Sequence, residues 1–431
     1  MFTFRNIHYA QTFHAALCTL IGIVLSLQIH AQAHSGNRPS QRTDTINVKD
    51  GNAANSSHSS DSLLLWPANV QSRLAKLTTD NMFSLSQLGM YVYDLTADSA
   101  IFDCGSRQLL RPASCQKLLT AITALSNLGA SYRLSTSLYH TGTIADSILH
   151  GDLYVVGGFD PAFGSDDMRA FCQSLDEAGI RKIDGALYAD LSFKDTLRWG
   201  KGWCWDDKMT RLTPLMYRKK DVFMQNFRNM LHDMGIEADS LAGMRVLPTQ
   251  NAKRMVVRYH TMDQVLQRMM KESDNIYAEA LLYQLGSRSG YASVNEALGK
   301  VQSLIRKSGE DVSHCRVADG SGLSLYNYTT PRILVSALRY AYLHNDIYLH
   351  LYPSLPIAGI DGTLRDRMSR GATYGNVHAK TGTVEGVSSL AGYITAANGH
   401  MLCFAIINQG ILHTKNGHAF QDRVCRALAE P

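Results

Sequence analysis

The chain has 431 residues, of which 45% are hydrophobic, so it is long enough for about two or three domains with buried cores. Its net charge of +5 is spread without a basic tract, which argues against a dedicated nucleic-acid-binding protein. The small positive excess is compatible with anionic polymers or carboxylates as partners.

The first 33 residues have the pattern of a secretory signal peptide. Arg5 precedes an apolar run at 15–27, and Ala31-Gln32-Ala33 fits a small-residue cleavage site. The apolar run is too short to span a membrane. We therefore expect an exported protein of the periplasm or cell envelope with no stable membrane insertion, and a retained membrane anchor is the alternative. Residues 34–61 are rich in Ser, Asn, Asp, Gly and His, and we expect a disordered lead-in there.

An ordered first part of a domain is expected at 62–138. Alternating apolar and polar residues on both sides of Ala97-Asp98-Ser99 predict a hairpin at 89–104. The residues after Lys117 are apolar at helical spacing, so they predict a buried helix that starts near Ser114. Residues three positions apart share one face of a helix, which would place Ser114 and Lys117 side by side.

This pairing could activate the serine. A neutral Lys117 could take the proton of Ser114 and make it a nucleophile, provided that the lysine pKa falls from about 10.4 towards about 7. Burial and a nearby like charge can produce a shift of that size. Ser114 alone could instead be a helix cap. Cys115 could be mistaken for the nucleophile, but it is two positions from Lys117 and would face elsewhere.

Residues 139–250 have a different sequence pattern, with short runs typical of β-strands separated by turn residues. This pattern predicts a smaller β-rich domain inserted into the first domain. A turn at Gly157-Gly158 is not followed by the Gly-Lys-Ser/Thr of a phosphate loop, so we interpret it as a plain turn. Gly202-Trp203-Cys204-Trp205-Asp206-Asp207 places aromatic residues beside acids. We interpret this segment as an aromatic packing plug, with a ligand-contact loop as the alternative.

Residues 251–431 are predicted to complete the first domain. They open with a strand candidate at 255–259, and Ser273-Asp274-Asn275 separates two helices, at 261–271 and 276–285. The end of the chain is predicted to contain strands at 376–383, 387–395 and 400–408 and a helix at 415–428. Three late strands and the early hairpin together predict an α/β domain, with a five-stranded antiparallel sheet flanked by helices.

The chain has eight cysteines, and seven of them follow the predicted signal peptide. Their wide spacing fits neither a zinc site nor a small disulfide scaffold. We expect at most one or two disulfides, at least one free thiol and no metal.

Three short motifs occur once each, in the order Ser114-x-x-Lys117, Ser273-Asp274-Asn275 and Lys380-Thr381-Gly382. Together they resemble the signature of penicillin-binding proteins and class A β-lactamases. A similar tripeptide, Lys307-Ser308-Gly309, is predicted to end a helix instead, with Gly309 as its cap. Gly382 is predicted to lie on a strand, where it would allow close backbone approach to a substrate.

The wider resemblance is to the D-alanyl-D-alanine carboxypeptidase/endopeptidase family, the low-molecular-mass class C penicillin-binding proteins. Further segments that look like that family are Gly157-Gly158-Phe159-Asp160-Pro161, Gly202-Trp203-Cys204-Trp205-Asp206-Asp207, Asp319-Gly320-Ser321-Gly322-Leu323-Ser324 and Ser389-Leu390-Ala391-Gly392-Tyr393. The resemblance implies a DD-peptidase/β-lactamase-like fold without a cofactor. It also implies peptidoglycan stem peptides as substrates and β-lactam antibiotics such as penicillin as inhibitors.

The resemblance also implies roles for the residues that react. Ser114 would attack a D-Ala-D-Ala peptide bond to form an acyl-enzyme, and Lys117 would be its base. Ser273 would relay a proton to the leaving amine, and Asn275 would hold Lys117 and the substrate amide. Water would then hydrolyse the acyl-enzyme.

The third motif is implied in substrate binding. Lys380 and Thr381 would bind the terminal carboxylate, and Gly382 would let the strand come close. The backbone N–H groups of Ser114 and Thr383 would form the oxyanion hole. The alternatives are a serine β-lactamase, for which the sequence places no deacylating Glu, and a non-catalytic module that binds penicillin or the cell wall.

Overall fold

The computed structural model describes residues 65–238, 240–288 and 290–431. The predicted signal peptide at 1–33 and the predicted lead-in at 34–61 lie outside these described residues. Within the described part of the chain, no helix has the length and apolar character needed to cross a membrane.

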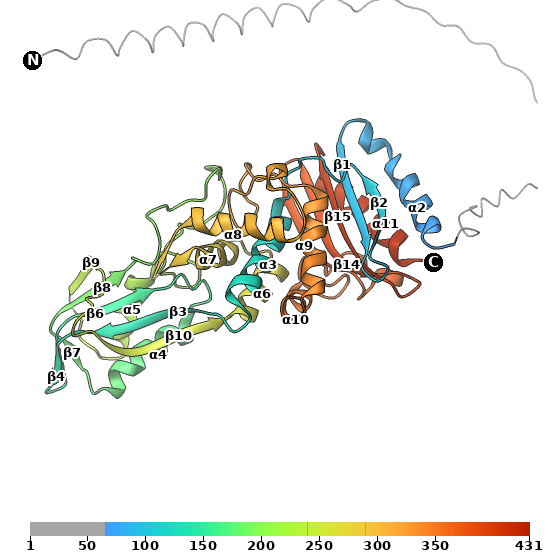
Figure 1. The fold of residues 1–431 in the computed structure, drawn as a ribbon. Helices are drawn as coiled ribbons and strands as arrows, with labels where there is room; N and C mark the ends of the chain where they lie inside the picture. The colour runs from blue at the N-terminus through green and yellow to red at the C-terminus, as the bar shows by residue number, and fades with distance from the viewer. Residues whose placement is uncertain (1–64, 239, 289) are drawn as a thin grey trace, which may run out of the picture. The chain divides into compact units, whose positions relative to one another are not determined.

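One five-stranded sheet is built from two strands near the start and three strands near the end of the described chain (Figure 1). Its strand order is β13-β14-β15-β1-β2, and every pairing is antiparallel. Its strands are β1 (Gln87–Asp94), β2 (Ser99–Cys104), β13 (His378–Val384), β14 (Val387–Thr395) and β15 (Met401–Gln409). The early hairpin lies beside the last strand, with Gly89 opposite Ile407. The predicted five-stranded antiparallel sheet is thereby confirmed.

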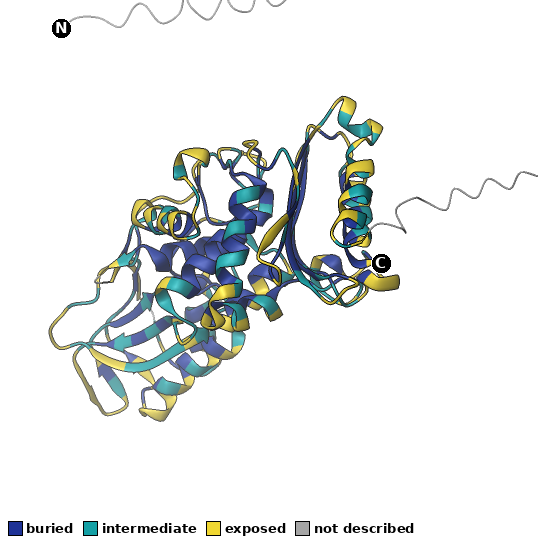
Figure 2. Cartoon of the chain, turned by 45° about the vertical axis from the view of Figure 1, so that its right-hand side comes forward, coloured by how far each residue is buried: buried dark blue, intermediate teal, exposed yellow. Residues whose placement is uncertain are grey.

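Helices cover both faces of this sheet (Figure 1). On one face, α2 (Ala68–Thr78) and α11 (Thr414–Ala429) share a hydrophobic core with the strands. The other face packs against the central helices. Figure 2 shows the strands in dark blue between these layers, and β14 and β15 are buried along nearly their whole length. Burial on both faces explains why β15 is a nearly continuous apolar run.

The central helices are α3 (Gln116–Leu128), α6 (Met262–Lys271), α7 (Asn275–Leu285), α8 (Val294–Lys307), α9 (Pro331–Leu343) and α10 (Asn345–Ser354). They share one hydrophobic core with the sheet. Every residue of α7 after Asn275 is buried, and so are the first ten residues of α3. A helix that is buried on all sides holds its few polar side chains rigidly, and α3 and α7 carry Lys117 and Asn275.

A second sheet has the strand order β10-β3-β6-β8-β9 and its own hydrophobic core under α4 (Ser165–Glu177) and α5 (Phe223–Asp233). Its strands are β3 (Arg133–His140), β6 (Leu153–Gly157), β8 (Ala186–Asp190), β9 (Ser240–Met244) and β10 (Lys253–Thr261). Smaller pairings join β4 (Thr143–Ala145), β5 (Ile148–His150) and β7 (Lys182–Ile183), and β11 (Ser287–Arg288) with β12 (Tyr291–Ala292).

The second sheet extends beyond the range 139–250 that we predicted for the insert. β3 begins at Arg133, and β10 pairs with it antiparallel along its length. The strand candidate at 255–259, which we assigned to the first domain, therefore lies in the second sheet. No turn marks the boundary in sequence, because Thr261 ends β10 and also caps α6 by accepting a hydrogen bond from the Gln264 N–H.

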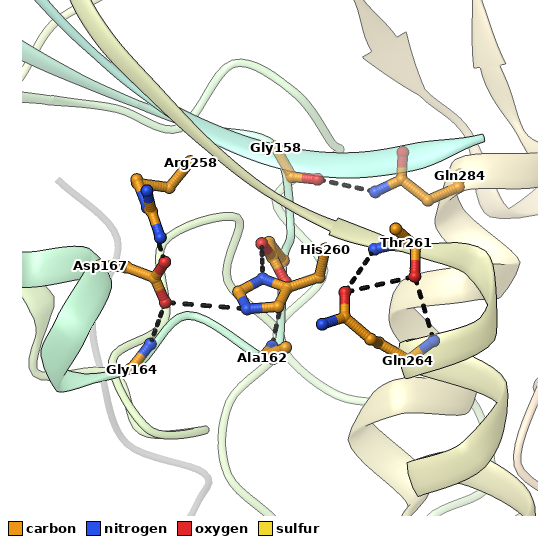
Figure 3. Close-up of polar contacts among 10 residues, drawn as sticks. Gly158, Ala162, Gly164, Asp167, Arg258, His260, Thr261, Gln264 and Gln284 are labelled. Carbon is orange, nitrogen blue, oxygen red and sulfur yellow. Dashed lines mark hydrogen bonds and ion pairs between the residues drawn. The ribbon is translucent and has the colours of Figure 1, made fainter. Parts of the chain in front are cut away.

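Polar contacts hold the end of β10 to the segment after β6 (Figure 3). Nδ1 of His260 lies 2.7 Å from Oδ2 of the buried Asp160, and Arg258 Nε donates to Asp167 Oδ1 at 2.8 Å. Burial raises the pKa of Asp160, and the hydrogen bond to Asp160 raises the pKa of His260. This cluster links β10 to the loop before α4.

The Gly157-Gly158 turn packs tightly within the same region. A Cβ built on Gly158 would lie 2.2 Å from the backbone oxygen of Ser135, so only glycine fits beside β3. The Gly158 carbonyl accepts a hydrogen bond of 2.6 Å from Gln284 Nε2 on α7 (Figure 3). The turn thus has a packing role that joins the second sheet to α7.

Seven cysteines lie in the described part of the chain, and all are free thiols: Cys104, Cys115, Cys172, Cys204, Cys315, Cys403 and Cys425. Four of them, Cys115, Cys172, Cys403 and Cys425, are fully buried. These buried thiols therefore contribute to packing.

Candidate active site

Ser114 lies in a single turn of 3₁₀-helix, η3 (Ala113–Cys115), which leads directly into α3. Its hydroxyl makes no capping bond to the helix, so the cap interpretation is wrong. The residue before it, Ala113, has a left-handed φ of +46°, which is uncommon for a residue with a Cβ. Such a conformation needs support from its surroundings and is typical of functional sites.

Lys117 lies one turn further along and is fully buried. Its Nζ is 2.9 Å from Ser114 Oγ, 2.7 Å from Asn275 Oδ1 and 2.7 Å from the backbone oxygen of Ser321. A neutral amine has two hydrogens and one lone pair. It can donate to Asn275 and Ser321 and still accept the hydrogen of the Ser114 hydroxyl, which is the arrangement that a base requires.

The surroundings of Lys117 favour the neutral form. Burial lowers the pKa of Lys117 to about 8, although the carboxylates of Asp319, Glu279 and Asp274 oppose this shift. Two of these carboxylates, on Asp319 and Glu279, are themselves buried. Burial and the charge of Asp319 raise the pKa of Glu279 to about 8.

Asp319 and Glu279 shape the loop that supplies the Ser321 oxygen. Glu279 accepts hydrogen bonds from the N–H groups of Gly320 and Ser321. Asp319 accepts from the backbone N–H groups of Gly322 and Ser324 and from the side chains of Trp203, Ser321 and Asn327. We did not predict a role for Glu279. Its position four residues after Asn275, on the same face of α7, is the signal that could have found it.

Ser273-Asp274-Asn275 forms the start of α7, with Asp274 as its cap: the Asp274 carboxylate accepts a hydrogen bond of 3.1 Å from the Ile276 N–H. Ser273 has a left-handed φ of +57°. This backbone turns the Ser273 and Asn275 side chains to two different lysines. Asn275 reaches Lys117, and Ser273 Oγ accepts a hydrogen bond of 2.9 Å from Lys380 Nζ.

Lys380 is as fully buried as Lys117, on β13 at the edge of the sheet. Burial, together with the positive charge of Lys117, lowers the pKa of Lys380 to about 7. Thr381 follows it, and its hydroxyl donates to Thr363 Oγ1 at 2.7 Å. Gly382 and Thr383 continue the strand, opposite Ser389 and Ser388 of β14.

Gly382 lies directly against the turn that carries Ser114. A Cβ at this position would lie 2.9 Å from Ser114 N, 2.8 Å from Pro112 O and 2.2 Å from Ser389 Oγ. A side chain would therefore push β13 away from η3. The structure thus brings the second and third motifs to Ser114 and Lys117, and Thr383 follows on the strand that touches the Ser114 backbone.

Cys115 points away from this centre. Its Sγ donates to the backbone oxygen of Lys380 at 3.2 Å, and burial raises the pKa of the Cys115 thiol. A buried thiol with a raised pKa carries little of the thiolate that a nucleophile needs. The decoy Lys307-Ser308-Gly309 lies at the end of α8, where Gly309 takes a left-handed φ of +90°.

The connection from β8 to α5, residues 191–222, also reaches the site. Trp203 Nε1 donates to Asp319 Oδ2 at 2.9 Å, and Asn275 Nδ2 donates to Met209 Sδ at 3.7 Å. Trp203 packs on the main core, whereas Trp205 is 97% exposed. The interpretation of 202–207 as a packing plug therefore holds for Trp203 and is wrong for Trp205. In the described residues, no group of three or more His, Cys, Asp or Glu side chains could hold a metal.

A family model of known proteins matches most of the described chain. The family model described as D-Ala-D-Ala carboxypeptidase 3 (S13) matches residues 70–216 and 211–430. The D-alanyl-D-alanine carboxypeptidase DacB of Haemophilus influenzae is 25% identical over 408 residues, covering 74% of this chain and 84% of the relative. A D-alanyl-D-alanine carboxypeptidase of an Actinomadura species is also 25% identical, over 445 residues, covering 79% of this chain and 81% of the relative.

Solved structures show the same fold. The crystal structure of penicillin binding protein 4 from Haemophilus influenzae superposes with a TM-score of 0.74 at 24% identity, covering 82% of this chain and 98% of that one. A predatory peptidoglycan endopeptidase from Bdellovibrio bacteriovorus superposes with a TM-score of 0.58 at 18% identity, covering 80% and 92% of the two chains.

Proposed function

The chain belongs to the D-Ala-D-Ala carboxypeptidase 3 (S13) family and is a serine-type D-Ala-D-Ala carboxypeptidase, and from this premise we propose that Ser114 is its nucleophile and Lys117 its base. The observation that carries this proposal is the 2.9 Å contact between Ser114 Oγ and the buried Nζ of Lys117. With two hydrogens directed to Asn275 and Ser321, the amine keeps its lone pair for the serine proton.

Acylation starts with the transfer of that proton. Ser114 Oγ attacks the carbonyl carbon of the D-Ala-D-Ala bond, and negative charge develops on the carbonyl oxygen. The backbone N–H groups of Ser114 and Thr383 donate to this oxygen and stabilise it. The missing side chain of Gly382 supports this assignment, because it lets the strand before Thr383 touch the Ser114 backbone.

The leaving D-alanine needs a proton on its amine and a partner for its carboxylate. As the C–N bond breaks, Ser273 relays to the amine the proton that Lys117 took from Ser114, and the Ser273 hydroxyl is hydrogen-bonded to Lys380. Lys380 and Thr381 bind the terminal carboxylate, and Asn275 holds the substrate amide while it positions Lys117. Hydrolysis of the acyl-enzyme on Ser114 by water completes the cycle. Depending on the bond presented, the same steps give carboxypeptidase or endopeptidase activity.

The substrates in this proposal are peptidoglycan stem peptides, and the protein works outside the cytoplasm, in the periplasm or cell envelope. Two observations on similar proteins support peptidoglycan as the substrate and β-lactams as inhibitors. The Bdellovibrio protein of the same fold is named a peptidoglycan endopeptidase. The Haemophilus penicillin binding protein 4 has been crystallised with a β-lactam. A β-lactam carries a carboxylate and a reactive carbonyl, so it would acylate Ser114 and inhibit the enzyme.

The test is intact-protein mass spectrometry after mixing with benzylpenicillin, combined with an assay of D-alanine release from a D-Ala-D-Ala peptide. We expect one long-lived adduct on Ser114, release of D-alanine, and loss of both in Ser114→Ala. Rapid turnover of penicillin without an adduct would indicate a serine β-lactamase. Penicillin binding without an adduct or D-alanine release would indicate a non-catalytic binding module.

A further inference from the structure

A tight turn on the connection from β8 to α5 has two consecutive residues in the left-handed region. Tyr217 and Lys220 exchange two backbone hydrogen bonds of 3.0 Å across the turn. Arg218 and Lys219 between them have φ angles of +51° and +63°. Two such residues with side chains are energetically unfavourable, and they persist only where the surroundings determine the conformation.

Hydrogen bonds hold this turn to the neighbouring segment. The Arg218 N–H donates to the backbone oxygen of Phe163 at 3.0 Å, and the hydroxyls of Tyr217 and Ser165 lie 3.1 Å apart. Phe163 is fully buried in the core of the second sheet. The backbone of the turn is therefore anchored to that core, and the half-buried Lys219 extends from it.

Lys219 reaches the start of α7. Its Nζ lies 2.7 Å from Oδ2 of Asp274, whose side chain is only 10% exposed. The other carboxylate oxygen of Asp274 caps α7 by accepting from the Ile276 N–H. Arg268 is a second cation near Asp274, but its Nε is 3.7 Å from the same oxygen. Lys219 is thus the nearer charged partner of Asp274.

Asp274 separates the two residues of the motif that meet the lysines. Ser273, on one side, has a left-handed backbone conformation, and its hydroxyl accepts a hydrogen bond from Lys380. Asn275, on the other side, accepts a hydrogen bond from Lys117. A shift of the Asp274 carboxylate would move both side chains, because all three residues share one short segment. Displacements of about 1 Å in a catalytic group can lower a rate by about 10²-fold.

We propose that Lys219 is a positioning residue, contributed by the second-sheet segment of the chain, which fixes Ser273 and Asn275 through its ion pair with Asp274. This inference rests on the proposed function of Ser273 and Asn275. It gives the second sheet a part in the reaction, since the turn is held by the core of that sheet. An exposed ion pair would contribute little, but this one ends on a carboxylate that is mostly buried and that also caps α7.

The test compares Lys219→Met with Lys220→Met, a matched control, because the structure records no hydrogen bond or ion pair for the Lys220 side chain among the described residues. In Lys219→Met we expect kcat for D-alanine release and the rate of penicillin acylation to fall by about 10- to 100-fold. KM should change less than kcat, because Lys380 and Thr381 on β13 still bind the terminal carboxylate when Asn275, which holds the substrate amide, is displaced. Lys219→Arg should recover most of the rate, since it keeps the charge.

A double-mutant cycle with Asp274→Asn makes the test independent of a general loss of stability, because asparagine is also a good helix cap. The cost of Lys219→Met should largely disappear in the Asp274→Asn background. Equal rates for Lys219→Met and Lys220→Met, or fully additive losses in the cycle, would overturn the inference while wild-type acylation of Ser114 stands. Absence of the wild-type adduct on Ser114 would overturn the proposed function and this inference together.

Discussion

Lys117 and Lys380 are both fully buried, and each holds the hydroxyl of a different serine at 2.9 Å, Ser114 for Lys117 and Ser273 for Lys380. Their electrostatic surroundings differ. Three carboxylates favour the charged form of Lys117, whereas Lys380 is affected mainly by burial and by the positive charge of Lys117. Burial lowers the pKa of both amines. A substrate carboxylate beside Lys380 would favour its charged form, and that charge would favour the neutral form of Lys117.

The pH dependence of the reaction follows from these two pKa values. The acylation rate should rise with pH as Lys117 loses its proton, with a midpoint near its pKa of about 8. The affinity for a peptide with a free terminal carboxylate should fall as pH rises through the Lys380 pKa of about 7, because the charged form is lost. Measurements of kcat and KM across this range test both trends. A peptide with an amidated C-terminus is the control, and its KM should lack the rise above pH 7.

Arginine substitutions separate the two roles. Lys117→Arg should abolish acylation, because a guanidinium keeps its proton at any working pH and cannot serve as a base. Lys380→Arg keeps the positive charge, so it should raise KM for carboxylate-bearing peptides and leave measurable acylation. Stopped-flow acylation by a reporter penicillin measures both effects. Near wild-type acylation by Lys117→Arg would contradict the role of Lys117.

The glycine of the third motif can be tested for its packing. Gly382→Ala would place a methyl group against Ser114 N and Ser389 Oγ and separate β13 from η3. If the N–H groups of Ser114 and Thr383 form the oxyanion hole, kcat should fall by about 10²- to 10³-fold with circular dichroism unchanged. Gly299→Ala on α8 is the control, because a Cβ there meets nothing within 4 Å. Alanine is also the better helix former, so this control should be neutral or slightly stabilising.

Much of the fold was predictable, because its strands and helices differ clearly in local pattern. The five-stranded sheet was predicted from an early hairpin with alternating apolar and polar residues and from three strand candidates near the end of the chain, and α7 from the apolar residues after Asn275. The boundary of the second sheet was missed because β10 continues into α6 without a turn: Thr261 ends the strand and caps the helix. Local sequence gives no signal for a boundary of that kind.

The candidate site was only partly predictable for a different reason. The residues of the three motifs can be identified in the sequence because together they resemble the signature of penicillin-binding proteins. Glu279 was missed because α7 was interpreted only as a buried apolar helix, and the spacing of four residues between Asn275 and Glu279 was not used. Lys219 was missed because its contact with Asp274 depends on how a turn more than 50 positions earlier in the chain is anchored to another core. Contacts of this type arise from tertiary structure and have no local pattern.

Glu279 gives a final prediction about stability. Its pKa in the folded protein is raised from 4.5 to about 8, so the folded state binds more protons at this residue than the unfolded state between those two values. The stabilisation by protonated Glu279 is therefore complete below about pH 4.5 and is lost as pH rises through 8. Glu279→Gln keeps an oxygen that can accept from the Gly320 and Ser321 N–H groups but has no charge to lose.

The variant should consequently gain stability relative to the wild type as pH rises from about 5 to 9, by a few kcal/mol at about 1.4 kcal/mol for each unit of pKa shift. Urea unfolding of both proteins across this range measures the difference. Asp311→Asn is the control, because Asp311 is an exposed carboxylate whose pKa is lowered by hydrogen bonds to Ser313. A difference in the free energy of unfolding between Glu279→Gln and the wild type that stays constant with pH would show that Glu279 remains ionised. The charge of Glu279 would then favour the protonated form of Lys117 and oppose the role of Lys117 as the base.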